Sequence, residues 1–226
     1  MRIKLLTSIL FLQFIVSGQQ NNMDVLHYKF HIGLNDLNDT IQGAAEIKVK
    51  FLSITDQLSF DLNLVNDQGK GMKIDKIEGA SVKGMMQEKD KITIINSKSF
   101  HAGDTATFII IYHGIPADGL IISKTKYGHR GFFADNWPDR GHNWLPCHED
   151  PADKATVEFL VTAPDHYQVV ANGIQIEESS WLNGNKLTYW KEETPISTKV
   201  MVIGVADFAV NLAGFVNDQI PIYSWV

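Results

Sequence analysis

The chain has 226 residues, of which 44% are hydrophobic and 20% are charged, so it can build a packed core in one large domain or two small ones. Its formal net charge of −6 argues against nucleic-acid binding, because a surface that neutralises phosphates needs an excess of Lys and Arg. The single cysteine, Cys147, excludes an intramolecular disulfide, and the fold must rest on its core alone.

Residues 1–18 have the layout of a cleavable secretory signal. Positive charges at Arg2 and Lys4 precede the apolar run LLTSILFLQFIVSG, and small residues then lead into a polar QQNN segment. Cleavage after Gly18 leaves 18 basic and 26 acidic residues, a net charge of −8. We therefore expect an exported protein (periplasmic, cell-surface or secreted), with no membrane span after cleavage. The alternative is a buried N-terminal helix.

Alternation of apolar and polar residues with a period of two dominates the rest of the chain, beginning at residues 25–34. There the apolar face consists of Leu26, Tyr28, Phe30, Ile32 and Leu34. The opposite face carries His27, Lys29 and His31. Further runs that predict strands are 44–51, 58–64, 92–96, 105–112, 154–162, 167–171, 186–190, 199–209 and the residues from Ile220 onward.

Turn-forming residues separate these runs, for example at 67–69, 102–104 and 183–185. Beyond the predicted signal, no window of a dozen residues has a convincing helical period. Many short strands, most with one polar face, predict an all-β fold: an antiparallel β-sandwich or barrel.

Metal ligands are the first chemistry to consider, because the chain has eight His. His27 and His31 are four residues apart in a predicted strand, which separates them by about 13 Å at roughly 3.3 Å per residue and excludes a shared ion. His142 and His148 flank Cys147, and with Glu149 they suggest a zinc site, although Pro146 breaks any regular spacing. The alternative is a local network of salt bridges: Asp139 with Arg140, and Glu149, Asp150 and Asp153 near Lys154.

The residues that follow rule out a metallopeptidase motif at this place. His148-Glu149 begins like His-Glu-x-x-His, but Asp150-Pro151-Ala152 follows and no second His completes it. The sequence also contains no Gly-x-Ser-x-Gly, no phosphate-binding glycine loop and no Rossmann signature. Cys147 is a candidate nucleophile, for which a buried structural thiol is the alternative.

The run WLPCHEDPADKATVEF, residues 144–159, resembles the aminopeptidase N family of zinc metallopeptidases. That family has an aromatic residue, Phe-Pro-Cys, two residues of acidic character, Pro, and then Lys-Ala-Thr leading into a strand. The likeness continues in VTAP at 161–164, YQVVANG at 167–173, and TPIST at 194–198 before a strand with an aromatic end. It covers nearly all of the chain after residue 18.

The resemblance implies that residues 19–226 form the family's saddle-shaped N-terminal β-sandwich. In the family, the chemistry lies in the next domain, where His-Glu-x-x-His and a later Glu bind zinc beside a Gly-x-Met-Glu-Asn motif. Neither motif occurs here. We therefore expect a non-catalytic domain without a metal of its own. It would dock a downstream catalytic domain and form one wall of a cleft for peptide substrates, and the complete enzyme would hydrolyse N-terminal residues from peptides.

The resemblance also points to a position that contacts substrate. A Gln or Glu of the family, on the loop before Phe-Pro-Cys, reaches the free amine of the peptide. That position falls on Trp137, whose indole N–H cannot accept a hydrogen bond from an ammonium, although its face can hold one by cation–π attraction. Asp135 and Asn136 are the neighbouring candidates. Core packing is the alternative for Trp137 and Trp144, and a turn role for Asp135.

Two other functions remain open from the sequence. One is a free-standing, non-catalytic β-sandwich that binds a peptide, a glycan or a protein partner. The other is the product of a remnant gene, without function. An exposed apolar face that normally meets another domain would favour the enzyme fragment over both.

Overall fold

The computed structural model describes residues 22–88 and 90–226, so the signal predicted at residues 1–18 lies outside the described residues. The described part of the chain forms sixteen β-strands and three short 3₁₀ segments, without an α-helix. No helix in this part is long and apolar enough to cross a membrane. The all-β prediction is confirmed.

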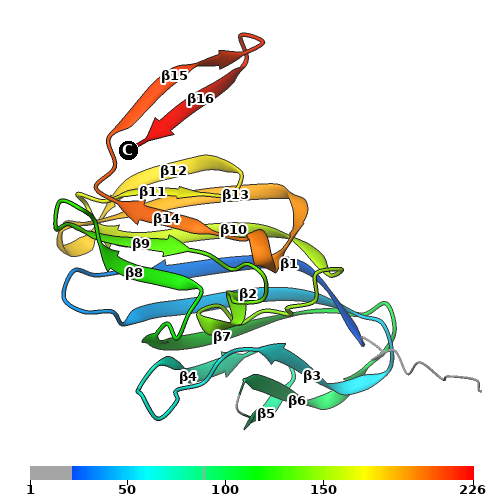
Figure 1. The fold of residues 1–226 in the computed structure, drawn as a ribbon. Helices are drawn as coiled ribbons and strands as arrows, with labels where there is room; N and C mark the ends of the chain where they lie inside the picture. The colour runs from blue at the N-terminus through cyan, green and yellow to red at the C-terminus, as the bar shows by residue number, and fades with distance from the viewer. Residues whose placement is uncertain (1–21, 89) are drawn as a thin grey trace, which may run out of the picture.

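The largest unit is a seven-stranded sheet with the order β12-β13-β10-β1-β2-β7-β4 (Figure 1). In chain order its strands are β1 (Met23–Gly33), β2 (Ile41–Phe51), β4 (Gly71–Glu78), β7 (Thr105–Ile115), β10 (Lys154–Pro164), β12 (Ile174–Trp181) and β13 (Asn185–Ser197). All neighbours pair antiparallel except β1 and β10, which are parallel.

Two smaller antiparallel sheets complete the sandwich. The four-stranded sheet has the order β11-β14-β9-β8, with β8 (Leu120–Lys124), β9 (Arg130–Ala134), β11 (Gln168–Ala171) and β14 (Ile203–Ala206). The three-stranded sheet has the order β3-β6-β5, with β3 (Thr55–Asp61), β5 (Val82–Glu88) and β6 (Lys91–Phe100). Buried residues of all three sheets belong to one hydrophobic cluster, so the sheets share one core.

A fourth unit, the hairpin of β15 (Val210–Val216) and β16 (Ile220–Trp225), projects from the body of the sandwich (Figure 1). The 3₁₀ segments are short connections: η1 (Gly141–Asn143), η2 (Leu182–Gly184) and η3 (Thr198–Val200).

Alternating burial explains why β10 lies in the middle of the large sheet. Every second residue of the strand is buried, namely Ala155, Val157, Phe159, Val161 and Ala163. Phe159 pairs in register with Phe30 of β1, and their rings stack with centroids 5.6 Å apart. The parallel pair therefore closes over aromatic side chains in the core.

The predicted face of the first strand needs one correction. A β-bulge between Val25 and His27 shifts the register of β1 on β2, so Met23 and Val25 are buried while Leu26 is only partly buried. From Tyr28 onward the expected alternation holds. A bulge inserts one extra residue into the strand, so the residues before the bulge point to the other face of the sheet. A prediction from an unbroken period of two cannot include this change of face.

The strand predicted over 199–209 is also shorter than expected. The structure has η3 followed by β14, and residues 201–202 between them belong to neither a helix nor a strand. The carbonyl oxygens of Thr198 and Met201 accept hydrogen bonds from the side chain of Asn136, at 3.1 and 2.7 Å. Because these acceptors point to the loop before β10, no strand can pair there.

We predict that Gly43→Ala destabilises the sandwich. A Cβ at Gly43 would lie 2.1 Å from Cζ of Tyr112, a buried ring of the core. Overpacking of this kind costs about 1–3 kcal/mol. Denaturant unfolding of Gly43→Ala should show this loss. Gly84→Ala is the control, because a Cβ there meets nothing within 4 Å. Equal stabilities of the two variants would contradict the close contact.

Candidate functional site

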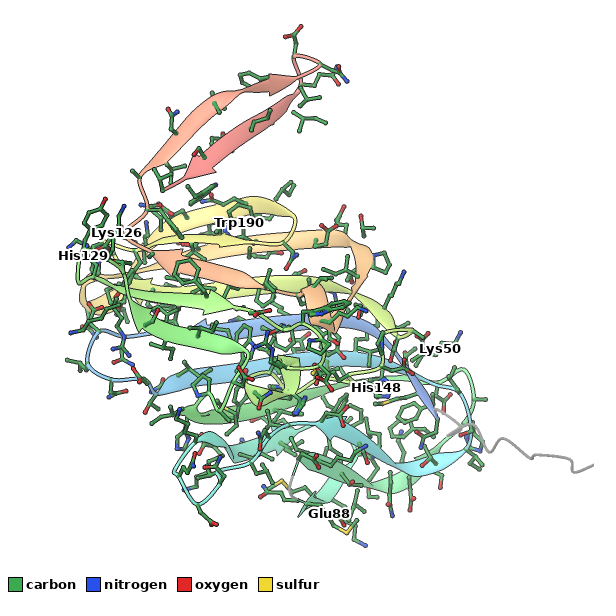
Figure 2. The ribbon with its side chains drawn as sticks, in the orientation of Figure 1. Lys50, Glu88, Lys126, His129, His148 and Trp190 are labelled. Atoms are coloured by element: carbon green, nitrogen blue, oxygen red, sulfur yellow. The ribbon has the colours of Figure 1, made fainter. Side chains whose placement is uncertain are left out.

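The loop between β9 and β10, residues 135–153, is anchored at both of its ends. The backbone N–H of Asp135 donates to the carbonyl of Gly119 at 2.6 Å. Cys147 and Asp61 exchange two backbone hydrogen bonds, of 2.7 and 3.1 Å, which join the loop to the end of β3. Figure 2 marks His148, directly after this bridge. The loop is therefore held between two sheets.

Asn136 is buried in the centre of the loop and fixes its path. Its Oδ1 accepts a 2.9 Å hydrogen bond from Nε1–H of Trp144, which is also fully buried. Its Nδ2 donates to the carbonyls of Thr198 and Met201. Both amide hydrogens are therefore used within the protein, and a buried amide satisfied in this way positions its neighbours.

Asp135 is exposed and forms an ion pair with Arg140. The same guanidinium donates from Nε to the carbonyl of Trp137 at 2.6 Å and lies 3.5 Å from the carboxylate of Asp118. Arg140 thus ties the two sides of the turn together. The network differs from the predicted pair of Arg140 with Asp139, because Arg140 faces back across the turn.

Trp137 is the most exposed aromatic side chain of the loop, with 60% of its surface accessible. The ammonium of Lys199, in η3, lies 4.6 Å from the centroid of its ring. This distance is within the range of a cation–π contact. The indole face is therefore oriented so that it holds an ammonium group, here one from the protein itself.

Two His of the loop bind different carboxylates. His142 pairs with Glu149, whose other oxygen accepts from the N–H of Gly141 at 2.7 Å. His148 Nδ1 lies 2.7 Å from Oδ2 of the buried Asp153. The hydrogen bond to its carboxylate raises the pKa of each His, against the opposing effect of burial. Glu149 and Asp153 were predicted to lie near Lys154, but in the structure their partners are His142 and His148.

Cys147 is fully buried, and burial together with nearby Glu149 and Asp61 raises the pKa of its thiol. A thiol that stays protonated is a poor nucleophile and a poor metal ligand. Across residues 22–88 and 90–226, no three side chains of His, Cys, Asp or Glu gather into a group that could hold a metal ion. The described residues do not fit zinc.

The exposed groups of the site are thus the carboxylate of Asp135 and the indole of Trp137, held in place by Asn136 and Arg140. Lys199 is the member that sequence reasoning missed. It lies 62 residues after Trp137 in a run that resembled a strand, and the signal that could have drawn attention to it is its place directly after the family-like TPIST at 194–198.

A family model for the Peptidase M1 N-terminal domain matches residues 25–200. Curated proteins contain no match. An M1 zinc metallopeptidase from Deinococcus radiodurans has a similar structure, with a TM-score of 0.74, 21% identity, and coverage of 90% of this chain and 47% of that one. A mutant of it bound to a Tyr-Ser-Ala substrate gives a TM-score of 0.73 and 20% identity, with 86% and 45% covered.

A two-domain M1 zinc metallopeptidase mutant bound to L-arginine gives a TM-score of 0.75 and 20% identity, with 90% of this chain and 47% of that chain covered. At these identities the likeness to the solved structures shows the fold. The chain spans about half the length of the solved structures that it matches.

We predict that Asn136→Ala destabilises the protein by about 2–4 kcal/mol, because it removes the partner of a buried indole N–H and of the Met201 carbonyl, and one of the two hydrogen bonds to the Thr198 carbonyl. Thermal and denaturant unfolding measure this loss. Asn211→Ala, at an exposed position of β15, is the control and should change little. A loss no larger than that of the control would show that Asn136 does not hold the loop.

We also predict that stability depends on pH through His142 and His148. Their raised pKa values mean that the folded protein binds these protons more tightly, so the stabilisation is complete below the ordinary His value of 6.5 and is lost as pH rises through the folded pKa values. Burial lowers the pKa values of His27 and His31, which act in the opposite direction.

The comparison that isolates this effect is a Tm profile of the wild type and of the double variant His142→Gln/His148→Gln. Between pH 6.5 and 8.5 the wild type should lose more Tm than the double variant. Parallel profiles would show that the two His–carboxylate pairs contribute nothing to the pH dependence.

Proposed function

Since this chain belongs to the M1 peptidase family, matching its N-terminal domain over residues 25–200, we propose that it is the N-terminal, non-catalytic domain of an exported zinc metallo-aminopeptidase. The complete enzyme hydrolyses N-terminal residues from peptides. The observation that carries this proposal is the family match, together with solved relatives about twice as long. One of these relatives holds a Tyr-Ser-Ala substrate.

The first task of the domain is to supply one wall of the substrate cleft. The loop at 135–140 supports this role, because Trp137 and Asp135 are exposed there. Buried Asn136 between them anchors the turn to the core. The contact of Lys199 with Trp137 has the geometry that a peptide ammonium would need. A free N-terminus would take the place of the Lys199 ammonium, and Asp135 would turn from Arg140 to accept from it. Asn136 positions both residues.

The second task is to dock the catalytic domain, and the hairpin of β15 and β16 is the surface that we assign to it. Its large apolar side chains are exposed on a two-stranded unit, which is marginal alone in water. They are Val210, Leu212, Phe215, Val216, Ile220, Ile222 and Tyr223. Exposed apolar side chains gathered on one small unit favour a site of association.

A cleft of about 760 Å³ separates this hairpin from β12, the edge strand of the large sheet. Ile174 and Ile176 of β12 and Trp225 of β16 are among the residues that line it. An apolar cleft beside an unpaired strand edge is suited to a packed protein partner.

Zinc belongs to the catalytic domain in this proposal. Among the described residues, no three side chains of His, Cys, Asp or Glu form a group that could hold it, and the sequence has no His-Glu-x-x-His. What this domain supplies to the reaction is recognition of the substrate's amine.

Export of the protein rests on residues 1–18, with their short positive region, apolar run and small residues before Gln19. N-terminal sequencing of the protein isolated from its natural source tests this directly. Export predicts a mature chain that begins at Gln19. A protein that retains Met1 and the apolar run contradicts it.

The second candidate is a free-standing binding module, and one feature favours it. A polar cavity of about 590 Å³ lies between β3, β6 and the loop at 148–150. Hydroxyl, amide and carboxylate groups line it, among them Thr55, Gln57, Ser59, Asp61 and Thr93. Such groups suit a hydroxyl-rich ligand, for example a glycan.

The experiment that decides between the two is to read the coding sequence beyond Val226. The enzyme proposal predicts a frame that continues into His-Glu-x-x-His and a later Glu. A stop codon directly after Val226 contradicts the enzyme proposal and favours the free-standing binding module. That module should be monodisperse in solution.

In the complete enzyme, which includes the catalytic domain, we predict that Trp137→Leu raises KM for peptides with a free N-terminus by about tenfold. This corresponds to the loss of one cation–π contact of roughly 1–2 kcal/mol. Steady-state kinetics on unblocked peptides measure it. Trp181→Leu is the matched control, since Trp181 is comparably exposed on β12, away from the loop. If both variants keep the wild-type KM, Trp137 does not bind the amine.

A further inference from the structure

His166, in the turn between β10 and β11, lies between two carboxylates from distant parts of the chain. Its Nδ1 is 2.5 Å from Oδ1 of Asp207, and its Nε2 is 3.0 Å from Oδ2 of Asp36. Asp36 belongs to the loop between β1 and β2, and Asp207 directly follows β14. One imidazole ring therefore joins two loops that are 171 residues apart in sequence.

The number of protons on this ring decides how many of the two contacts are hydrogen bonds. An ionised carboxylate only accepts, and a neutral imidazole carries one N–H. Both contacts are satisfied only when His166 is the doubly protonated imidazolium. In the neutral ring, one nitrogen lone pair faces a carboxylate oxygen, and that contact becomes repulsive.

Neighbouring groups fix the two carboxylates in this geometry. Tyr167 donates its hydroxyl to Oδ1 of Asp36 at 2.5 Å, and Nδ1 of His129, in the turn between β8 and β9, lies 2.9 Å from Oδ2 of Asp207. Arg130 pairs with Asp39 in the same loop as Asp36. We call Asp36, His129, His166, Tyr167 and Asp207 the His166 latch.

The latch acts at the root of the hairpin. Only Phe208 and Ala209 separate Asp207 from β15, and Ala209 exchanges two backbone hydrogen bonds with Val226, of 2.7 and 3.1 Å. Figure 2 places His129 at the end of the sandwich from which the hairpin departs. Aromatic pairs with ring centroids about 6 Å apart also lie at this root: Phe133 with Phe208, Phe208 with Trp225, and Trp225 with Trp190.

We propose that the His166 latch is a pH-sensitive switch that fixes the direction of the β15–β16 hairpin when His166 is protonated and frees it when His166 loses a proton. With the latch closed, Asp207 is held by two imidazole rings and the hairpin keeps one orientation. With the latch open, His166 keeps only one of its two carboxylate contacts, and the root is held by that contact, by His129 with Asp207 and by the aromatic pairs. A root held by fewer contacts permits a wider range of angles. The switch depends only on the contacts of the latch and not on the enzyme proposal.

The electrostatics of the latch agree with this direction. Hydrogen bonds to Asp36 and Asp207 raise the pKa of His166. For Asp36, burial acts to raise the pKa, but hydrogen bonds from Tyr167 and His166 outweigh it and the pKa is lowered. The stability that the closed latch contributes is therefore fully present between the ordinary Asp pKa of 3.8 and the ordinary His pKa of 6.5. It is lost as pH falls through the lowered pKa of Asp36, and the latch opens as pH rises through the raised pKa of His166.

The test is the distance between the hairpin and the large sheet as a function of pH. Nitroxide labels at Ser180→Cys on β12 and Gln219→Cys in the hairpin turn report this distance by pulsed electron resonance, while buried Cys147 stays unlabelled in the native protein. We expect a narrow distribution at pH 5.5 and one at least twice as wide at pH 8.5. The midpoint should coincide with the titration of the His166 ring followed by NMR.

Variants separate the latch from general effects of pH. His166→Gln should give the wide distribution at both pH values. If His166→Gln does not fold, Asp207→Asn provides the same comparison. His113→Gln is the matched control, because His113 pairs with Asp75 at 2.7 Å on β7 and β4, away from the hairpin. It should behave as the wild type. A wild-type distribution that does not widen, or a pH response that persists in both latch variants, overturns the proposal.

Discussion

The parallel pairing of β1 with β10 is the constraint on which the rest of the molecule depends. Parallel neighbours cannot be joined by a hairpin, so all of the chain between Gly33 and Lys154 must serve as the connection. That connection contains the three-stranded sheet, half of the four-stranded sheet and the loop at 135–153. The loop enters β10 directly, and Asp153 accepts two hydrogen bonds from the N–H of Val25, at 3.1 and 3.3 Å. The start of β1 and the end of the loop are thereby fixed to each other.

Alternation of residue types was a good guide wherever one face of a strand meets the core and the other meets water. The strands at 44–51 and 154–162 were found in this way, since their buried residues follow the period of two closely. The run at 58–64 was found in part, because β3 spans Thr55–Asp61. β12 and β5 were missed because most of their residues are exposed and no apolar face repeats. A period also cannot show direction, so the parallel partner of β1 was not foreseen. The bulge at Val25 has no sequence signature of its own.

For the candidate site, too, the sequence indicated some features and missed others. Asp135, Asn136 and Trp137 were selected from a family resemblance and lie together because they are adjacent in the chain. Their different roles depend on residues far away: Asn136 is committed to Thr198 and Met201, and Trp137 faces Lys199. No local pattern encodes these partners, since they are brought into contact only when β13 and β14 assemble beside the loop. Local sequence therefore selects candidate residues, while tertiary packing decides which of them face solvent.

Cys147 has a consequence for how the protein ages in an oxidising environment. In the native state its thiol is fully buried and protonated, so oxidants and other thiols do not reach it. Each opening of the bridge to Asp61 exposes a lone thiol, and two opened molecules can then be joined covalently through their sulfurs. Such a crosslink removes the chain from the folding equilibrium for as long as the conditions stay oxidising. Under such conditions the lifetime of the protein would be set by its rate of unfolding rather than by its equilibrium stability.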